Sequence, residues 1–330
     1  MGQDGTDIPQ RRPGIALSPT YGQALLTLCE QATERVFLAA PFIKERVLRR
    51  LLQAIPASSE VTIVTRWIPE EVAHGVCDLG ILDLATERHK TRLLLHPCLH
   101  AKYYRVDSRC LVGSANLTAT ALGWCPVPNI EILLEVSPEE HGLPKLEERL
   151  QQQSIMATES IREAVAQAVE EFRRRDQNII APVGEPSGLQ DPFRASAWLP
   201  ICVSPEYLFK IYSGADTSAL LTSAVSAGQH DLSSLAIIPG LSEDDFRRYV
   251  VAILDQTPVV QEISSLSRHS AITPETAIAV IVKVMAGIPS PAYDAEIYWL
   301  ALKRWLIYFF PDLYRVRAAV EVFEQARELP

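Results

Sequence analysis

Residues 100–116 read H-A-K-Y-Y-R-V-D-S-R-C-L-V-G-S-A-N, and this stretch decides both the fold and the chemistry. His100 and Lys102 are two residues apart, so in an extended strand their side chains point to the same face. A second apolar run ends in a glycine followed by Ser114, and Asn116 comes two residues later. An imidazole, an ammonium, a hydroxyl and an amide, beside a glycine that lets the backbone approach, predict a phosphate-binding site. The imidazole can attack phosphorus while the other groups hold its oxygen atoms.

The chain around this stretch alternates short apolar runs with amphipathic ones. Helical spacing predicts helices at Tyr21–Glu34 and Lys44–Ala54, and a short helix is expected after Ser114. Strands that alternate with helices predict a layered α/β domain, with a mixed β-sheet sandwiched by helices. The expected strands are Val36–Ala40, Val61–Trp67, Thr91–Leu95, His100–Val106, Cys110–Gly113 and Ile130–Val136.

The second half of the chain reads differently. Residues 143–175 are helical and highly charged in pattern, which predicts either two amphipathic helices on the sheet or one long helix leading away. Residues 176–197 are rich in Pro, Gly and polar residues and are expected to form a linker. A mainly helical domain should follow, with helices that begin after Ser242 and Thr273 and helices at Ala292–Phe310 and Asp312–Leu329. The predicted segments are an N-terminal tail (1–17), an α/β domain (18–175), a linker (176–197) and a helical C-terminal domain (198–330).

Charge is distributed unevenly along the chain. The net charge of −9 is unfavourable for contact with nucleic acid. Residues 1–175, however, hold 20 Lys and Arg against 22 Asp and Glu, so most of the negative charge lies beyond them. Several arginines of the first half could form a phosphate-binding face or simply a mixed, solvated surface: Arg46, Arg49, Arg50, Arg66, Arg105 and Arg109.

Composition also bears on the compartment. The chain of 330 residues has no apolar stretch of the roughly 20 residues that cross a bilayer, and its acidic start is unlike a secretory signal. The six cysteines are scattered without a C-x-x-C pair, and most have apolar neighbours. We therefore expect reduced core thiols in a cytoplasmic protein that has no membrane contact.

The motif stretch resembles the H-x-K-x4-D…G-S-x-N signature of the phospholipase D superfamily. The resemblance spans about residues 18–175, and Glu131 in N-I-E stands where family members carry a downstream carboxylate. Residues 35–43 (R-V-F-L-A-A-P-F-I) and 61–67 (V-T-I-V-T-R-W) look like earlier core strands of that fold. Five residues separate Asp107 from the glycine of G-S-x-N, where six are usual, which predicts a tighter turn between the two motif strands.

The resemblance implies a mechanism that needs two histidines: one attacks phosphorus to form a phosphohistidine, and the other protonates the leaving group and later activates water. Only His100 in this chain is followed by a lysine two residues on. We therefore expect a homodimer whose motif faces meet across a two-fold axis, with one composite site. On this view Lys102, Ser114 and Asn116 bind phosphate, Glu131 fixes the tautomer of the histidine, and Asp107, which belongs to the catalytic signature, has a structural or charge-balancing role. The reaction needs no metal and no cofactor.

Three neighbouring features are open to a second interpretation. Arg66 at a strand end is a candidate substrate contact, although simple packing is an alternative. His96 and Cys98 in H-P-C-L-H could suggest a metal site, but a proline in a strand-like run prevents the helical spacing that His-x3-His needs. The aromatic residues of 298–310 fall at helical spacing and are most simply the core of the C-terminal domain, or else part of a partner surface.

The family includes lipases, phosphatidyltransferases and nucleases, so the resemblance does not fix the substrate. One motif and no membrane anchor favour a DNA nuclease, similar to the metal-independent restriction endonucleases of the superfamily. The resemblance extends to phospholipase-D-like proteins that accompany deazaguanine DNA-modification systems in prokaryotic defence, and the acidic C-terminal domain would then bind a protein partner or regulate the enzyme. A hydrolase of lipids or small phosphodiesters is the second hypothesis, and a non-catalytic subunit for nucleic-acid binding or assembly is the third.

Overall fold

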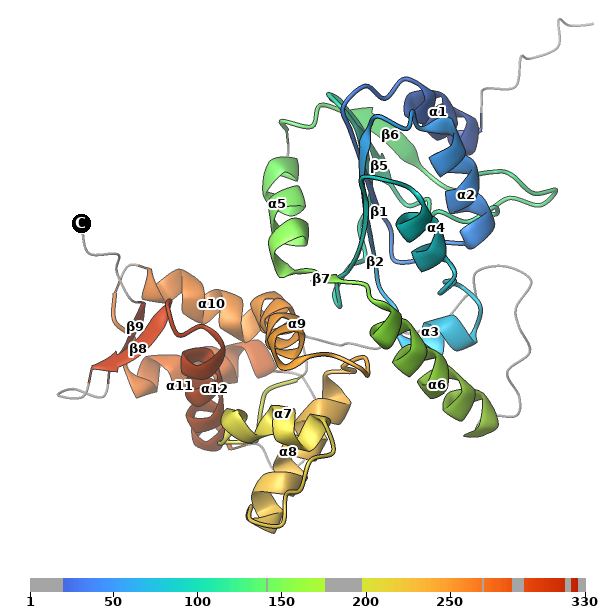
Figure 1. Ribbon diagram of the computed structural model, residues 1–330. Coiled ribbons are helices and arrows are strands. Elements are labelled where there is room, and N and C mark those ends of the chain that lie inside the picture. Colours follow the sequence, from blue (N-terminus) through green and yellow to red (C-terminus); the bar gives the residue numbers. More distant parts are fainter. Residues whose placement is uncertain are drawn as a thin grey trace, which may run out of the picture.

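The computed structural model contains two parts, an α/β part and a largely helical part (Figure 1). The tail 1–17 and the linker 176–197 expected from the sequence lie outside the described residues, so their boundaries stay predictions. The structure describes residues 20–140, 142–175, 198–268, 270–286, 294–317 and 322–325.

A seven-stranded sheet forms the centre of the α/β part, in the order β6-β5-β4-β1-β2-β3-β7. Strands β1, β2 and β3 run parallel, whereas β4, β5, β6 and β7 pair antiparallel, so the predicted mixed sheet is confirmed. The strands are β1 (Arg35–Ala39), β2 (Glu60–Thr65), β3 (Thr91–Leu95), β4 (Lys102–Val106), β5 (Arg109–Gly113), β6 (Leu133–Val136) and β7 (Ile155–Met156).

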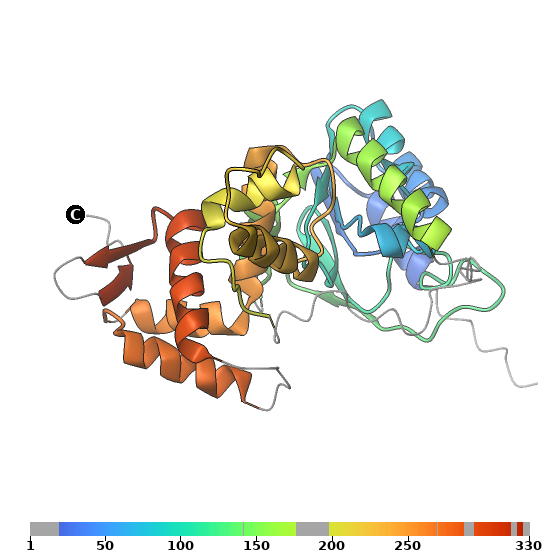
Figure 2. The ribbon, with the colours of Figure 1, turned by 90° about the horizontal axis from the view of Figure 1, so that it is seen from below.

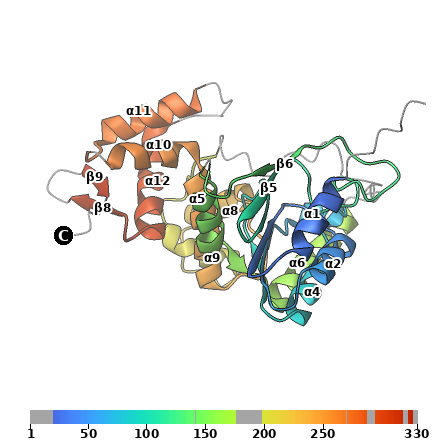
Figure 3. The ribbon, with the colours of Figure 1, turned by 90° about the horizontal axis from the view of Figure 1, so that it is seen from above.

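Helices cover both faces of this sheet. Seen from above, α1, α2, α4 and α6 lie on one side and α5 on the other (Figure 3). A separate buried cluster lies under α5, where Leu150 packs with Phe37 and Tyr103. The helices are α1 (Tyr21–Glu30), α2 (Glu45–Ala54), α3 (Pro69–Ala73), α4 (Ile81–Glu87), α5 (Leu143–Gln153) and α6 (Glu159–Arg175).

Two local predictions for this part need correction. Residues 143–175 form two helices, as one alternative held, but β7 lies between them, and its Ile155 pairs with Leu95 of β3 and is fully buried. The helix expected after Ser114 is not formed. Leu117 instead makes a parallel bridge with Ile43, because the backbone there satisfies its hydrogen bonds with the chain that follows β1.

The second part is helical, as expected, except at its end. Ser242 and Thr273 do cap helices, since their side chains accept hydrogen bonds from backbone N–H groups three residues on, at 3.2 and 3.3 Å. The elements are a 3-10 turn (Pro205–Tyr207), α7 (Leu208–Tyr212), α8 (Thr222–Ser234), α9 (Glu243–Gln256), α10 (Pro258–Ser267), α11 (Pro274–Met285), α12 (Ala295–Phe309), β8 (Tyr314–Arg317) and β9 (Val322–Gln325).

The predicted helix Asp312–Leu329 is wrong, because β8 and β9 form an antiparallel hairpin within that range. The hairpin stacks Tyr314 on Phe323 with ring centroids 4.8 Å apart, and Phe323 also meets Trp299 of α12 edge-on at 5.5 Å. Burial of these aromatic rings outweighs the helical spacing of the sequence. The hairpin lies at the end of the molecule far from the sheet (Figure 2).

The two parts meet along α9. This helix packs against α5 and β7, and Asp255 at its end accepts a hydrogen bond from Gln153 Nε2 at 3.2 Å. The same carboxylate lies 3.6 Å from Arg149 of α5. Ala252 of α9 is also in contact with Cys98, two residues before His100. The helical part therefore rests directly beside the segment that leads into the motif strands.

Candidate active site

The candidate site lies at one end of three adjacent strands. In the sheet register Lys102 of β4 stands opposite Gly113 of β5, and Gly113 stands opposite Leu133 of β6. The three sequence motifs, H-x-K, G-S-x-N and N-x-E, therefore come together at this end of the sheet. The pairing of β5 with both β4 and β6 produces the meeting, although residues 114–132 form a long connection between β5 and β6.

His100 and Lys102 begin this arrangement. His100 is exposed two residues before Lys102, the first residue of β4. Lys102 has only 9% of its surface exposed, and its Nζ donates a hydrogen bond of 3.0 Å to the carbonyl oxygen of His100. The ammonium is thus held against the backbone of the residue that carries an exposed imidazole, where its positive charge can act on an anion bound nearby.

Gly113 and Ser114 come from the end of β5. A Cβ atom at Gly113 would lie 1.9 Å from the backbone oxygen of Ile132, a distance that no side chain allows. Glycine is therefore required for the close approach of β5 and the chain before β6. Ser114 exploits this approach: its N–H donates to Ile132 O at 2.9 Å, and its hydroxyl oxygen accepts from Ile132 N at 3.0 Å.

The carboxylate of Glu131 forms a hydrogen bond with Ser114, and not with His100 as the sequence predicts. Its carboxylate accepts a short hydrogen bond from the Ser114 hydroxyl and a second one from Asn129 Nδ2 at 3.3 Å. The Tyr21 hydroxyl donates to the backbone oxygen of Glu131 at 2.9 Å. In the described part of this single chain the carboxylate therefore orients Ser114, where the sequence prediction had it hold the histidine.

Asn116 is placed by the turn that follows β5. It is buried, and the turn around it is tied to β4 by the Tyr104 hydroxyl, which donates to Ala115 O at 2.6 Å. The next residue, Leu117, donates its N–H to Phe42 O at 3.1 Å. The G-S-A-N turn is thus fixed against β4 and against the segment that follows β1, which makes it a rigid support for the site.

Asp107 lies at the opposite end of β4 from Lys102, roughly 16 Å away at the rise of an extended strand. It is the first of two turn residues between β4 and β5 and has a positive φ of 50°. Its carboxylate accepts four hydrogen bonds of 2.8–3.0 Å from the backbone N–H groups of Thr33, Glu34 and Arg35 and from the Thr33 hydroxyl. Burial opposes the charge, but these donors outweigh it and hold the pKa of Asp107 below its usual value. Asp107 thus anchors the start of β1 and does not reach the other motif residues.

Arg66 follows β2 but does not face outward. It is 4% exposed, and its guanidinium forms two hydrogen bonds with the carboxylate of Glu71, which is also buried. Its charge also lies 5.7 Å from the ring centre of Phe42. The structure therefore assigns Arg66 to a buried ion pair in place of the substrate contact proposed from its position.

The other arginines do not gather at the site. Arg46, Arg49 and Arg50 are exposed on α2, where Arg49 pairs with Glu45 and Arg50 stacks over Trp124 at 4.1 Å. Arg109 at the far end of β5 forms an ion pair with Glu135. Arg46, Arg49 and Arg50 thus share one helix, and Arg109 lies apart from them on β5.

His96 is buried between the two parts of the chain. Its Nδ1 accepts a hydrogen bond of 3.2 Å from the backbone of Cys98. Burial lowers the pKa of His96 to about 4, so the ring is neutral at ordinary pH. Among the residues that the structure describes, no group of three or more His, Cys, Asp or Glu side chains is placed to hold a metal ion.

Tyr21 and Tyr104 are two supporting residues that the sequence reasoning missed. Tyr104 had a detectable signal, because it follows His100 and Lys102 at the same two-residue spacing and so shares their face of the strand. Tyr21 had none, since its partner Glu131 is 110 residues away. Both tyrosines fix backbone and neither is placed to react.

Comparison with known proteins gives weak similarities. No protein family model matches the chain, and no curated protein is significantly similar to it. Among solved structures the chain is similar to NucT from Helicobacter pylori, at 17% identity and a TM-score of 0.31 over 39% of this chain and 83% of that one. It is also similar to phosphatidylserine synthase from Haemophilus influenzae Rd KW20, at 14% identity and a TM-score of 0.32 over 46% and 42% of the two chains. A third similarity, to TrmBL2, an archaeal chromatin protein, has 17% identity and a TM-score of 0.26 over 39% and 46%.

At identities of 14–17% and TM-scores of 0.26–0.32, these structures do not show what the residues of the candidate site do. In the described ranges of the chain, no helix has both the length and the apolar character needed to span a bilayer.

Proposed function

We propose that this chain is a phospholipase-D-type phosphodiesterase that cleaves DNA without a metal ion, through a phosphohistidine on His100. The observation that carries the proposal is the meeting of His100, Lys102 and Ser114 at the ends of neighbouring strands β4 and β5. His100 is exposed, so a phosphodiester can approach its ring. Lys102 supplies positive charge beside it, which stabilises the negative five-coordinate phosphorus centre.

The reaction proceeds in two steps that conserve atoms and charge. A neutral nitrogen of His100 forms a bond to phosphorus, and the bond from phosphorus to the leaving oxygen breaks. The leaving oxygen takes a proton from the imidazolium of the partner subunit's His100. That ring, now neutral, accepts a proton from water while the water oxygen attacks phosphorus and the bond to His100 breaks. Both histidines regain their starting protonation states.

In this proposal a second copy of the chain supplies the histidine that protonates the leaving oxygen. Three large apolar side chains lie exposed on and just before the edge strand β6, on either side of Glu131: Ile130 at 103%, Ile132 at 53% and Leu134 at 55% exposure. Ile132 and Leu134 are two residues apart and so share one face. An apolar surface of this kind next to a half-site favours contact with another copy of the chain, and an isologous interface would bring the two His100 rings together.

The remaining site residues have supporting roles in this proposal. Asn116 and Lys102 hold phosphate oxygens. Ser114 gives its single hydroxyl hydrogen to Glu131 in the free chain, so it can donate to phosphate only after that bond is exchanged. Asp107 is structural.

The substrate and the biological setting extend the proposal. A single H-x-K motif followed by a separate second part suits a DNA nuclease of a prokaryotic restriction or defence system in the cytoplasm, including one tied to deazaguanine-modified DNA. The helical part, which rests on α5 and β7 beside the motif segment, is positioned to bind a protein partner that controls the site.

Cleavage of plasmid and single-stranded DNA in excess EDTA tests this proposal. The wild type is compared with His100→Ala and with His89→Ala, which removes an exposed histidine from the turn before β3. We expect cutting that survives EDTA, is lost in His100→Ala and is kept in His89→Ala. Cutting that requires added metal would contradict the mechanism. Hydrolysis of a phospholipid in preference to DNA would mean that the substrate is a lipid and not DNA. Full function of the His100→Ala variant would indicate a non-catalytic subunit.

A further inference from the structure

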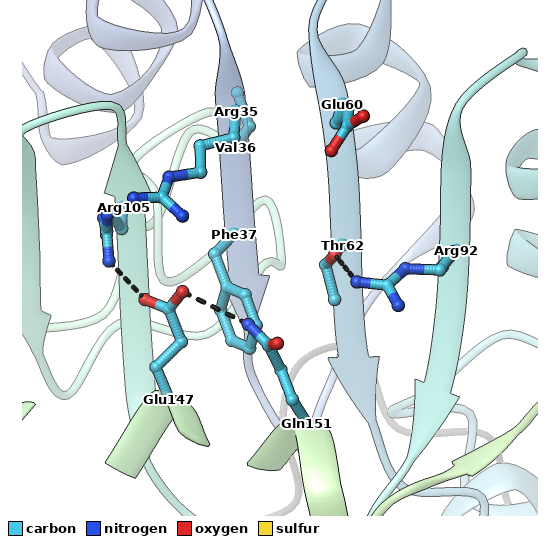
Figure 4. A pocket seen from close by; sticks show the side chains of 9 residues that line it. All are labelled: Arg35, Val36, Phe37, Glu60, Thr62, Arg92, Arg105, Glu147 and Gln151. Carbon is cyan, nitrogen blue, oxygen red and sulfur yellow. Dashed lines mark hydrogen bonds and ion pairs between the residues drawn. The ribbon is translucent and has the colours of Figure 1, made fainter. Parts of the chain in front are cut away.

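A second polar cavity lies on the α5 face of the sheet, away from the candidate active site. Its volume is about 200 Å³, and it lies between α5 and strands β1 to β4 (Figure 4). Three arginines from three different strands line it: Arg35, Arg92 and Arg105. We call this cavity the arginine pocket.

The sheet register explains why these arginines converge. Arg105 stands opposite Phe37, Phe37 opposite Thr62, and Thr62 opposite Arg92, so one row of side chains crosses four strands. The backbones of Arg105 and Arg92, at the two ends of this row, are about 14 Å apart, because three strand spacings of about 4.8 Å lie between them. The side chain of Arg92 points along this row toward Thr62 (Figure 4). Arg35 lies two residues before Phe37 on β1, so its side chain lies on the same face of the sheet, in the neighbouring row.

Arg105 is held in place by protein groups. Its NH1 donates to Glu147 Oε2 at 2.9 Å, and its Nε donates to the Asp107 carbonyl at 2.8 Å. The Tyr103 hydroxyl donates to the same Glu147 oxygen at 2.9 Å. Burial opposes the charge on Arg105, but the attraction of Glu147 outweighs it and raises the pKa of the guanidinium. The negative charge of Glu147 is therefore already matched.

The other two arginines keep donors that no group in the described part of the chain uses. Arg92 makes one side-chain hydrogen bond, to the neutral Thr62 hydroxyl at 3.1 Å, and the Arg35 guanidinium makes none with any residue in the described ranges. Glu60 is the other carboxylate that lines the pocket, and it is exposed at the rim. Three arginines against two glutamates leave a positive balance in a chain whose net charge is −9.

We propose that the arginine pocket binds the phosphate group of a ligand and admits a part of that ligand no larger than a mononucleotide. Guanidinium groups that enter from two sides match the tetrahedral oxygens of phosphate better than a planar carboxylate. The confined volume between α5 and the sheet excludes a duplex. The pocket is also separate from the active site, because Arg105 and Lys102 are three residues apart on β4 and so point to opposite faces.

Calorimetric titration of the full chain tests this site, with inorganic phosphate, adenosine 5′-monophosphate, adenosine and a 5′-phosphorylated tetranucleotide as probes. Arg35→Gln and Arg92→Gln are the test variants, since glutamine keeps the first part of the aliphatic chain and a hydrogen-bond donor but removes the charge. Arg49→Gln is the matched control, because Arg49 is exposed on α2, outside the pocket, and pairs with Glu45. The His100→Ala variant separates the pocket from the active site, and circular dichroism of each variant checks the fold.

We expect adenosine 5′-monophosphate to bind wild type and His100→Ala alike, adenosine not to bind, and each pocket variant to weaken binding by about tenfold or more. Arg49→Gln should bind within about twofold of wild type. Equal affinity for the tetranucleotide would identify the terminal phosphate of a strand as the source, and weaker affinity would identify a free nucleotide. Phosphate binding that is lost in His100→Ala and kept in both pocket variants would overturn this inference while supporting the proposed function. Failure of every phosphate probe to bind would also overturn it.

Discussion

Replacement of Asp107 separates a structural role for this motif residue from a catalytic one. The carboxylate accepts four hydrogen bonds from residues 33–35 at the start of β1. At a half-exposed site each such bond contributes roughly 1 kcal/mol, and the four are not independent, so Asp107→Ala should lower the free energy of unfolding by about 3 kcal/mol. Asp107→Asn keeps one acceptor oxygen and tolerates the positive φ, so it should cost about half as much.

Urea unfolding followed by circular dichroism measures these differences, in the transition assigned to the α/β part. Ser108→Ala, at the next and exposed turn position, is the control and should change stability by less than about 0.5 kcal/mol. At a temperature where Asp107→Asn is folded, its DNA cleavage per molecule should stay within about twofold of wild type. A stable Asp107→Ala protein without cleavage activity would refute the structural role and place Asp107 in the reaction.

Three further predictions concern the interface, the composite site and the response to pH. Ile132→Asp should convert the proposed dimer to a monomer in sedimentation and abolish cleavage, and a dimer that persists would show that the exposed apolar side chains beside β6 are not the interface. In mixtures of wild type with His100→Ala, activity should fall as the square of the wild-type fraction, whereas a linear fall would mean that each chain works alone. His96, with a pKa of about 4 when folded and about 6.5 when unfolded, binds more protons in the unfolded state, so stability should decline as pH falls from about 6.5 to 4. The full effect is about 3 kcal/mol, and the difference in stability between wild type and His96→Gln across this range should show it; a difference that does not change with pH would mean that His96 is not buried.

The arrangement of the motif strands could be predicted from the sequence because its physical cause is local. The two-residue period of His100 and Lys102 and the short turn after Val106 define an antiparallel pair, and β6 follows from its own apolar run. The partner of Glu131 could not be predicted. Whether its carboxylate meets an imidazole or a hydroxyl depends on the close approach at Gly113, which a sequence does not display.

Two further features could not be predicted because they also depend on tertiary packing: strand β7 and the hairpin of β8 and β9. Strand β7 has two residues, too few for any alternating pattern, and exists because β3 has an open edge. The helix predicted at Asp312–Leu329 is replaced by the hairpin of β8 and β9, because the sequence pattern does not reveal that Phe323 packs between Tyr314 and Trp299. Such outcomes depend on tertiary packing, which overrides local propensity.

The arginine pocket was also beyond the reach of the sequence. Arg35, Arg92 and Arg105 lie on strands that are separated along the chain, and only the register brings them to one face. Arg66 shows the converse: its place after β2 leaves both a substrate contact and simple packing open, and the buried ion pair with Glu71 favours packing.

The stereochemical course at phosphorus tests the central claim most directly. A chiral phosphorothioate diester is cleaved in ¹⁸O-labelled water in the presence of EDTA, and the configuration of the product is determined. Two successive in-line displacements, first by His100 and then by water, predict overall retention of configuration. Inversion would mean that water attacks phosphorus directly, and it would contradict a covalent intermediate on His100.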